Sequence, residues 1–143
     1  MLDIELLIKA VLTLFLTPIT LLHVYWLCGG KGALDGALPN DLATLKKRFS
    51  ALTFYIGNFF ALLPVILTLL YLIFSFYLSL GPLDKFQHQL YLFFSIIFII
   101  RGLFGWMINK FTTKSIFIKR NTLFYSPIAL FLGILLYILY KLS

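Results

Sequence analysis

The sequence predicts an all-α membrane protein in which four transmembrane helices form an antiparallel bundle. Of its 143 residues, 62% are hydrophobic and 12% are charged, whereas ordinary soluble domains carry about 25% charged residues. Four apolar segments are each close to or above the ~20 residues that a helix needs to cross the hydrocarbon core. The composition predicts an integral membrane protein, and residues 1–143 are expected to form a single transmembrane domain.

The first two segments are expected to be helical over residues 6–28 and 51–80. Glu5 and Lys9 stand one helical turn apart at the start of the first segment, so their side chains can pair. The second segment has 30 residues, or ~45 Å of helix, against a hydrocarbon core of ~30 Å. It is therefore expected to tilt, to bend at Pro64 or to project beyond the bilayer.

The third and fourth segments are expected over residues 90–108 and 124–142. Gly81 and Pro82 mark a short turn between the second and third segments, which predicts that these two helices are antiparallel neighbours. Ser126 followed by Pro127 is typical of a helix start, with the serine as N-cap and the proline at the first helical position. The fourth helix is therefore predicted to begin at this pair.

The basic residues predict how the helices are threaded, because cytoplasmic loops carry an excess of lysine and arginine. Eight basic residues lie in the first and third connections, and three lie in the second connection or near the termini. The eight are Lys31, Lys46, Lys47, Arg48, Lys110, Lys114, Lys119 and Arg120; the three are Lys9, Lys85 and Lys141. This asymmetry predicts that both termini are extracytoplasmic. Asp3 and Glu5 stand where a signal peptide would be positively charged, so the first segment is expected to remain.

Arg101 is the most unusual residue, because it lies inside the apolar run of the third segment, ~10 Å from its predicted cytoplasmic edge. A charge in hydrocarbon costs about 2.5–3.5 kcal/mol even on insertion scales, and it is usually retained for a partner or a function. The five acidic residues all lie at segment ends or in loops. The threading brings other polar groups to the same depth, which is where a bundle is expected to hold a binding site.

Two partners for Arg101 remain open. The first is structural: Asp35, in the glycine-rich first connection, forms an ion pair with Arg101 inside a network that also contains Trp26, Gly29, Gly30 and Trp106. The second is an anionic ligand, such as the phosphate of an inner-leaflet lipid or a phosphorylated isoprenoid, bound by the guanidinium fork. In that case the candidate ligand-binding residues are Arg101, His23, Lys31, Asn58, Tyr125 and Ser126.

The sequence predicts no catalytic residue, metal site or cofactor. His23 and His88 are placed at opposite membrane faces, and Cys28 is the single cysteine. Topology accounts for the basic residues, so no nucleic acid is expected.

A protein that binds an anionic lipid or polyprenyl phosphate is one interpretation of the sequence. The alternative is an interaction, accessory or immunity protein without a small ligand. A homo-oligomeric pore is disfavoured because the outer half of the predicted bundle lacks a polar stripe. An enzyme is disfavoured because the sequence offers few acid–base groups. The expected partners are the bilayer, an anionic lipid, and a protein partner or second copy.

Two stretches of the sequence resemble a known family. Residues 22–30 read LHVYWLCGG and precede Pro39, and a later series comprises Arg101-Gly102, Gly105, Lys110, Phe117 and Tyr125-Ser126-Pro127. Together they resemble the signatures of small bacterial membrane proteins catalogued as domain of unknown function 3995. The resemblance implies a four-helix protein of the bacterial inner membrane and no particular activity. The chain departs from the family pattern at Lys31-Gly32, where members often have Trp, and at Trp106, where they tend to have Asp. The missing acid argues against a carboxylate-dependent mechanism.

Overall fold

The computed structural model describes residues 2–30, 32, 51–77, 86–111 and 115–143, and the regular secondary structure in these ranges is all helical. Within them, four helices are long and apolar enough to cross a membrane: Ile4–Leu27, Asn58–Ser75, Gln87–Met107 and Ser115–Leu142. The prediction of an all-α, multi-pass membrane protein is therefore confirmed. In chain order the elements are α1 (Leu2–Leu27), α4 (Ala51–Tyr77), α5 (Gln87–Ile108), the 3-10 turn η2 (Asn109–Phe111), α6 (Ser115–Arg120), the π-helical turn η3 (Asn121–Tyr125) and α7 (Ser126–Leu142).

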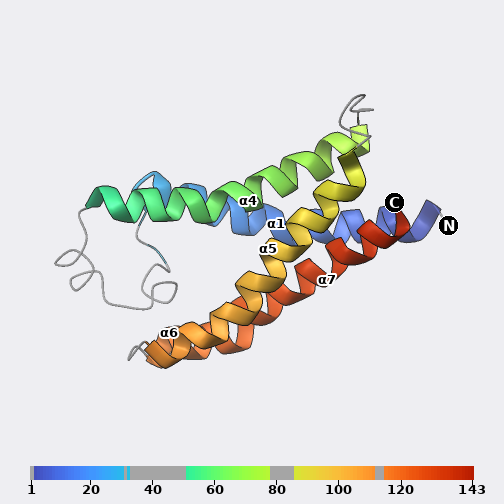
Figure 1. The fold of residues 1–143 in the computed structure, drawn as a ribbon. Coiled ribbons are helices and arrows are strands. Elements are labelled where there is room, and N and C mark those ends of the chain that lie inside the picture. The colour runs from blue at the N-terminus through green and yellow to red at the C-terminus, as the bar shows by residue number, and fades with distance from the viewer. Residues whose placement is uncertain (1, 31, 33–50, 78–85, 112–114) are drawn as a thin grey trace.

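The helices associate as two pairs, α1 with α4 and α5 with α7. Figure 1 shows that the two pairs meet at the end of the molecule that holds both chain termini, and diverge toward the end that holds α6. Contacts between the pairs join α1 to α7 and α4 to α5. We call these two ends the terminal end and the diverging end.

The hydrophobic core lies in the half of the molecule nearer the terminal end. Each helix contributes an inward stripe of apolar side chains at helical spacing, as Ile8, Leu12 and Leu16 do from α1. When the helices associate in a bilayer, these side chains lose contacts with lipid and not with water. The hydrophobic effect therefore contributes little, and van der Waals packing is the main force between the helices. The other members of the core are Val65, Leu69, Tyr71, Leu72, Tyr91, Phe94, Phe98, Leu132, Leu136 and Leu139.

Small residues allow α5 and α7 to pack closely. A β-carbon on Gly133 would lie 2.7 Å from Cγ1 of Ile99 and 2.9 Å from its backbone nitrogen, so only glycine fits there. The Ser95 hydroxyl donates to the carbonyl of Gly133 at 2.8 Å, and both residues are buried. A β-carbon on Gly102 would lie 2.5 Å from Cγ of Leu130. This close approach is typical of helix pairs in membranes, where packing and interhelical hydrogen bonds replace the hydrophobic effect.

The first helix begins earlier than predicted, at Leu2 rather than residue 6. Glu5 and Lys9 are therefore inside a helix, and the predicted ion pair between them is confirmed at 2.7 Å. Both also fall within the first candidate membrane span. Glu5 is the second residue of this span, which agrees with the predicted placement of the acidic residues at segment ends or in loops. The helix extends because Leu2, Ile4, Leu6 and Leu7 supply apolar residues on both sides of Glu5.

The α-helix α7 begins at Ser126, where its start is predicted, but the predicted role of Ser126 as the N-cap is wrong. Ser126 has right-handed helical dihedral angles and lies inside a helix of 28 residues that begins at Ser115. Its backbone N–H donates to the carbonyl of Asn121, five residues earlier, which is the hydrogen bond of a π-helix. Proline in a regular helix clashes with the carbonyl four residues before it. The wider π-helical turn directly before Pro127 relieves this clash. The chain is therefore already helical before the Ser-Pro pair.

Candidate functional site

Polar residues follow the apolar stripes of three helices where the two helix pairs begin to diverge. On α1 the stripe continues from Leu16 to Thr20 and His23. On α4 the corresponding polar residue is Asn58, and on α5 it is Arg101, which follows Phe98 by one turn. We use the term polar layer for Thr20, His23, Asn58 and Arg101, together with Asn121 and Ser126 beside them. The sequence predicted four of these six residues as a candidate binding site.

His23 and Asn58 join α1 to α4 in the polar layer. The Asn58 side-chain amide donates to the backbone carbonyl of His23 at 3.3 Å. Nδ1 of His23 lies 2.8 Å from the carbonyl oxygen of Ile19. Because a carbonyl oxygen can only accept, Nδ1 must carry a proton. Nε2 is then the ring nitrogen left for another partner.

Thr20 places an unpaired hydroxyl in the same layer. The hydroxyls of Thr13, Thr17 and Thr68 each donate to the carbonyl four residues earlier, which is the usual solution for threonine in an apolar helix. Thr20 is 7% exposed, and its hydroxyl has no hydrogen-bond partner among the described residues. Buried polar groups without a partner are rare in native proteins and indicate a missing water or ligand. Sequence analysis did not select Thr20, because one threonine in an apolar run carries no distinguishing signal.

Arg101 is exposed on α5, and no carboxylate in the described part of the chain lies within 4.0 Å of it. Its Nη1 lies 3.1 Å from the point that a β-carbon on Gly105 would occupy, so the guanidinium rests over this glycine. Its charge also acts on His23 of α1 across the diverging end. Asp35, its predicted ion-pair partner, and Lys31, a predicted ligand residue, lie outside the described residues.

A buried polar cluster supports Arg101 from the α7 side. Asn121 is fully buried, and its side-chain amide donates to the carbonyl of Gly105 and, at 2.9 Å, to the side-chain oxygen of Asn109. The Ser126 hydroxyl donates to the Asn121 side-chain oxygen at 3.2 Å. These groups pair with one another, and none of these hydrogen bonds involves Arg101. The π-helical turn places Asn121 and Ser126 on one side of the helix, and such turns are frequent at functional sites.

The remaining predicted residues make other contacts. Gly29, with φ +90°, and Gly30 end α1 through backbone bonds to the carbonyls of Trp26 and Tyr25 at 3.1 and 2.9 Å. The indole N–H of Trp26 donates to the carbonyl of Gly32 at 2.9 Å. These contacts form a local cap at the end of α1. Tyr125 is half-buried in η3 and Trp106 is exposed on α5.

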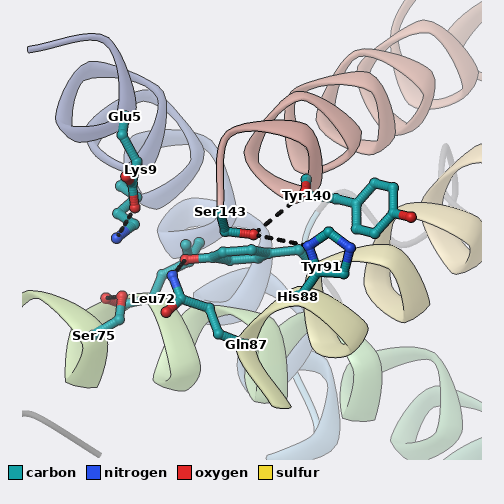
Figure 2. A network of polar contacts seen from close by, with 9 residues as sticks. All are labelled: Glu5, Lys9, Leu72, Ser75, Gln87, His88, Tyr91, Tyr140 and Ser143. Atoms are coloured by element: carbon teal, nitrogen blue, oxygen red, sulfur yellow. Dashed lines mark hydrogen bonds and ion pairs between the residues drawn. The ribbon is translucent and has the colours of Figure 1, made fainter. Parts of the chain in front are cut away.

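A second polar network lies at the terminal end, around the fully buried hydroxyl of Tyr91 (Figure 2). Gln87 donates its side-chain amide to this hydroxyl at 3.4 Å. Lys9 and Ser75 also interact with it, and Ser75 donates to the carbonyl of Leu72 at 2.8 Å. Lys9 is only a donor, so the Tyr91 oxygen accepts from it. The network connects α1, α4 and α5, and its groups satisfy each other.

Residues 16–136 match a protein family described as "Protein of unknown function (DUF3995)". The matched region contains all six residues of the polar layer and covers most of the chain. The chain belongs to the DUF3995 family. Comparison with curated proteins gave no match, and comparison with solved structures gave none either. Membership of DUF3995 confirms the predicted resemblance and assigns no activity. In the described part of the chain, no group of three or more His, Cys, Asp or Glu side chains could hold a metal ion.

Proposed function

We propose that this protein is a bacterial inner-membrane protein that binds the anionic head group of a lipid, either a phospholipid or a polyprenyl phosphate, at Arg101. One observation carries the proposal: a guanidinium in a membrane-spanning helix is positioned over a polar cluster, yet it pairs with no carboxylate of the described chain. Arginine offers five N–H donors in a planar fork that matches phosphate. An intramembrane charge of this kind is a functional-site hypothesis by default.

The topology that we propose is antiparallel, with both termini outside the cell. The excess of basic residues in the first and third connections supports this threading. The diverging end, with Arg101, then lies in the inner leaflet, and the terminal end lies in the outer leaflet. Among the described basic residues, Lys110 and Lys119 are exposed near the diverging end and would attract anionic lipids to it.

Native mass spectrometry of gently extracted protein tests the proposal. Wild-type protein is expected to retain an anionic lipid, and Arg101→Ala to lose it. Arg101→Lys keeps the charge but loses the bidentate fork, so it is expected to retain the lipid only partly. Lys141→Ala is the matched control, because it removes one positive charge at the terminal end, where Lys141 lies over the rings of Tyr137 and Tyr140.

Two other outcomes would reject the proposal. If wild type and Arg101→Ala retain the same lipids, Arg101 is not the binding residue. If neither retains a lipid, and Asp35→Asn lowers the unfolding temperature as much as Arg101→Ala does, then Arg101 belongs to a structural ion pair. Co-purification of a protein subunit without lipid would instead support an accessory or immunity role.

A further inference from the structure

We infer that the polar layer recognises a terminal phosphate, as in a phosphomonoester lipid, rather than the phosphodiester of an ordinary phospholipid. This inference rests on the lipid-binding function proposed above and narrows the class of head group. It follows from the hydrogen-bonding character of three side chains: Arg101, His23 and Thr20. Thr20 and His23 lie one turn apart on α1, and the charge of Arg101 on α5 acts on His23.

His23 is the residue that discriminates. Its Nδ1 donates to the carbonyl of Ile19 at 2.8 Å, which fixes the tautomer. In the neutral ring Nε2 is therefore an acceptor. A charge is costly to place in hydrocarbon, so the neutral ring is the form considered for the proposed site. The layer thus offers the strong donors of Arg101 beside a hydrogen-bond acceptor.

A phosphodiester does not match this arrangement. It carries one negative charge and only acceptor oxygens, so the lone pair on Nε2 of His23 would face another lone pair. A terminal phosphate in its singly ionised form has a P–O–H group as well as charged oxygens. Its second proton dissociates with a pKa of about 6 in water. The P–O–H group can donate to Nε2 while the charged oxygens accept from Arg101.

Thr20 supplies the third contact. Its buried hydroxyl has no partner among the described residues and lies one turn before His23 on the same stripe. A hydroxyl both donates and accepts, so it can bind a further phosphate oxygen. Thr20 therefore adds a contact to either head group, and the preference for a terminal phosphate comes from its P–O–H donor to His23.

The test compares lipids that share acyl chains and differ in the head group. Purified protein in detergent is titrated with dioleoyl phosphatidic acid, a phosphomonoester, and with dioleoyl phosphatidylglycerol, a phosphodiester, and bound lipid is counted by native mass spectrometry. Glycerol 3-phosphate is the third ligand, a phosphomonoester without acyl chains. Wild type is expected to bind phosphatidic acid about tenfold more tightly than phosphatidylglycerol, the difference that one charge-assisted hydrogen bond provides. Glycerol 3-phosphate is expected to bind much more weakly.

His23→Phe separates hydrogen bonding from charge. Phenylalanine keeps an aromatic ring beside Trp26, whose ring lies 5.2 Å from that of His23, and removes the acceptor. The variant is expected to lose the preference for phosphatidic acid while keeping its affinity for phosphatidylglycerol. If the preference persists in this variant, it reflects the larger charge of phosphatidic acid and the inference is wrong.

The wild-type measurement needs no variant and separates this inference from the proposed function. Equal affinities for the two lipids, both lost in Arg101→Ala, would overturn the terminal-phosphate inference and leave the lipid-binding function intact. Binding of neither lipid would overturn both. Glycerol 3-phosphate binding as tightly as phosphatidic acid would identify a soluble phosphate ester as the ligand and overturn the assignment to a lipid.

Discussion

The guanidinium of Arg101 lies over Gly105, with Nη1 3.1 Å from the position of the absent β-carbon. The same position lies 3.3 Å from the side-chain oxygen of Asn121 and is even closer to the Ser126 hydroxyl. Because Gly105 has no side chain, α5 and α7 can approach each other at this point, and the guanidinium of Arg101 can lie over the glycine. A side chain here would disturb the helix contact and the arginine together.

Gly105→Ala is accordingly expected to lower both stability and lipid retention. The added methyl group collides with Ser126, and overpacking of this kind typically costs about 1–3 kcal/mol. Circular dichroism during thermal unfolding in detergent measures the first effect, and native mass spectrometry the second. Leu103→Ala, on the exposed side of α5, is the control and should change neither. Unchanged unfolding of Gly105→Ala would show that the two helices are not in close contact here.

Asn121→Leu is expected to destabilise the protein, because leucine keeps the branched shape of the side chain but makes none of its hydrogen bonds. The substitution leaves the carbonyl of Gly105, the side chain of Asn109 and the hydroxyl of Ser126 without their partner. A buried group left unsatisfied costs about 1–3 kcal/mol. Thr122→Val is the control, because Thr122 is exposed and bonds only to Asn109 among the described residues, at 2.8 Å. The unfolding temperature should fall for Asn121→Leu and stay nearly constant for Thr122→Val; equal shifts would contradict the assigned role of Asn121.

Hydropathy and helical period were sufficient to predict the four spanning helices, because a bilayer requires long apolar segments. The ion pair between Glu5 and Lys9 was also predictable, since it depends only on the spacing along one helix. The π-helical turn before the fourth helix was not predictable. Ser-Pro is compatible both with an N-cap and with the turn after a π-helix, and the choice depends on the packing of Asn121 and Ser126 against Gly105.

The sequence predicted those residues of the candidate site whose depth in the membrane follows from their position along a helix. Arg101, His23 and Asn58 were selected because a helix places each at a calculable height. Asn121 was missed because it was read as part of a polar connection, and Tyr91 because one tyrosine in an apolar run resembles ordinary packing. Both acquire their roles from contacts between helices, and no spacing within one segment specifies those contacts. The pairing of Arg101 with Asp35 stays a prediction.

Gly133→Ala tests the closest approach of α5 and α7 at the centre of the bundle. The new methyl group would meet both the side chain and the backbone nitrogen of Ile99, at 2.7 and 2.9 Å, so the helices must separate. Separation also lengthens the hydrogen bond from Ser95 to the Gly133 carbonyl. We expect a loss of about 1–3 kcal/mol in the free energy of unfolding, measured by denaturant titration in micelles. The exposed neighbour Ile134→Ala should have little effect. Comparable stability of the two variants would argue against a close helix contact.

Tyr91→Phe tests whether the network at the terminal end holds three helices together. Removing the hydroxyl takes away the partner of Gln87 and the contact of Lys9 and Ser75, while the ring keeps its packing 5.5 Å from that of Tyr71. Lys9 retains its ion pair with Glu5, so no isolated charge is created. The expected loss is therefore that of unsatisfied polar groups, about 1–3 kcal/mol, and thermal unfolding in detergent should report it. Tyr137→Phe is the matched control on an exposed ring. Lipid retention at Arg101 should be unchanged in Tyr91→Phe, because the apolar core separates the two ends; a loss of lipid would show that the ends are coupled.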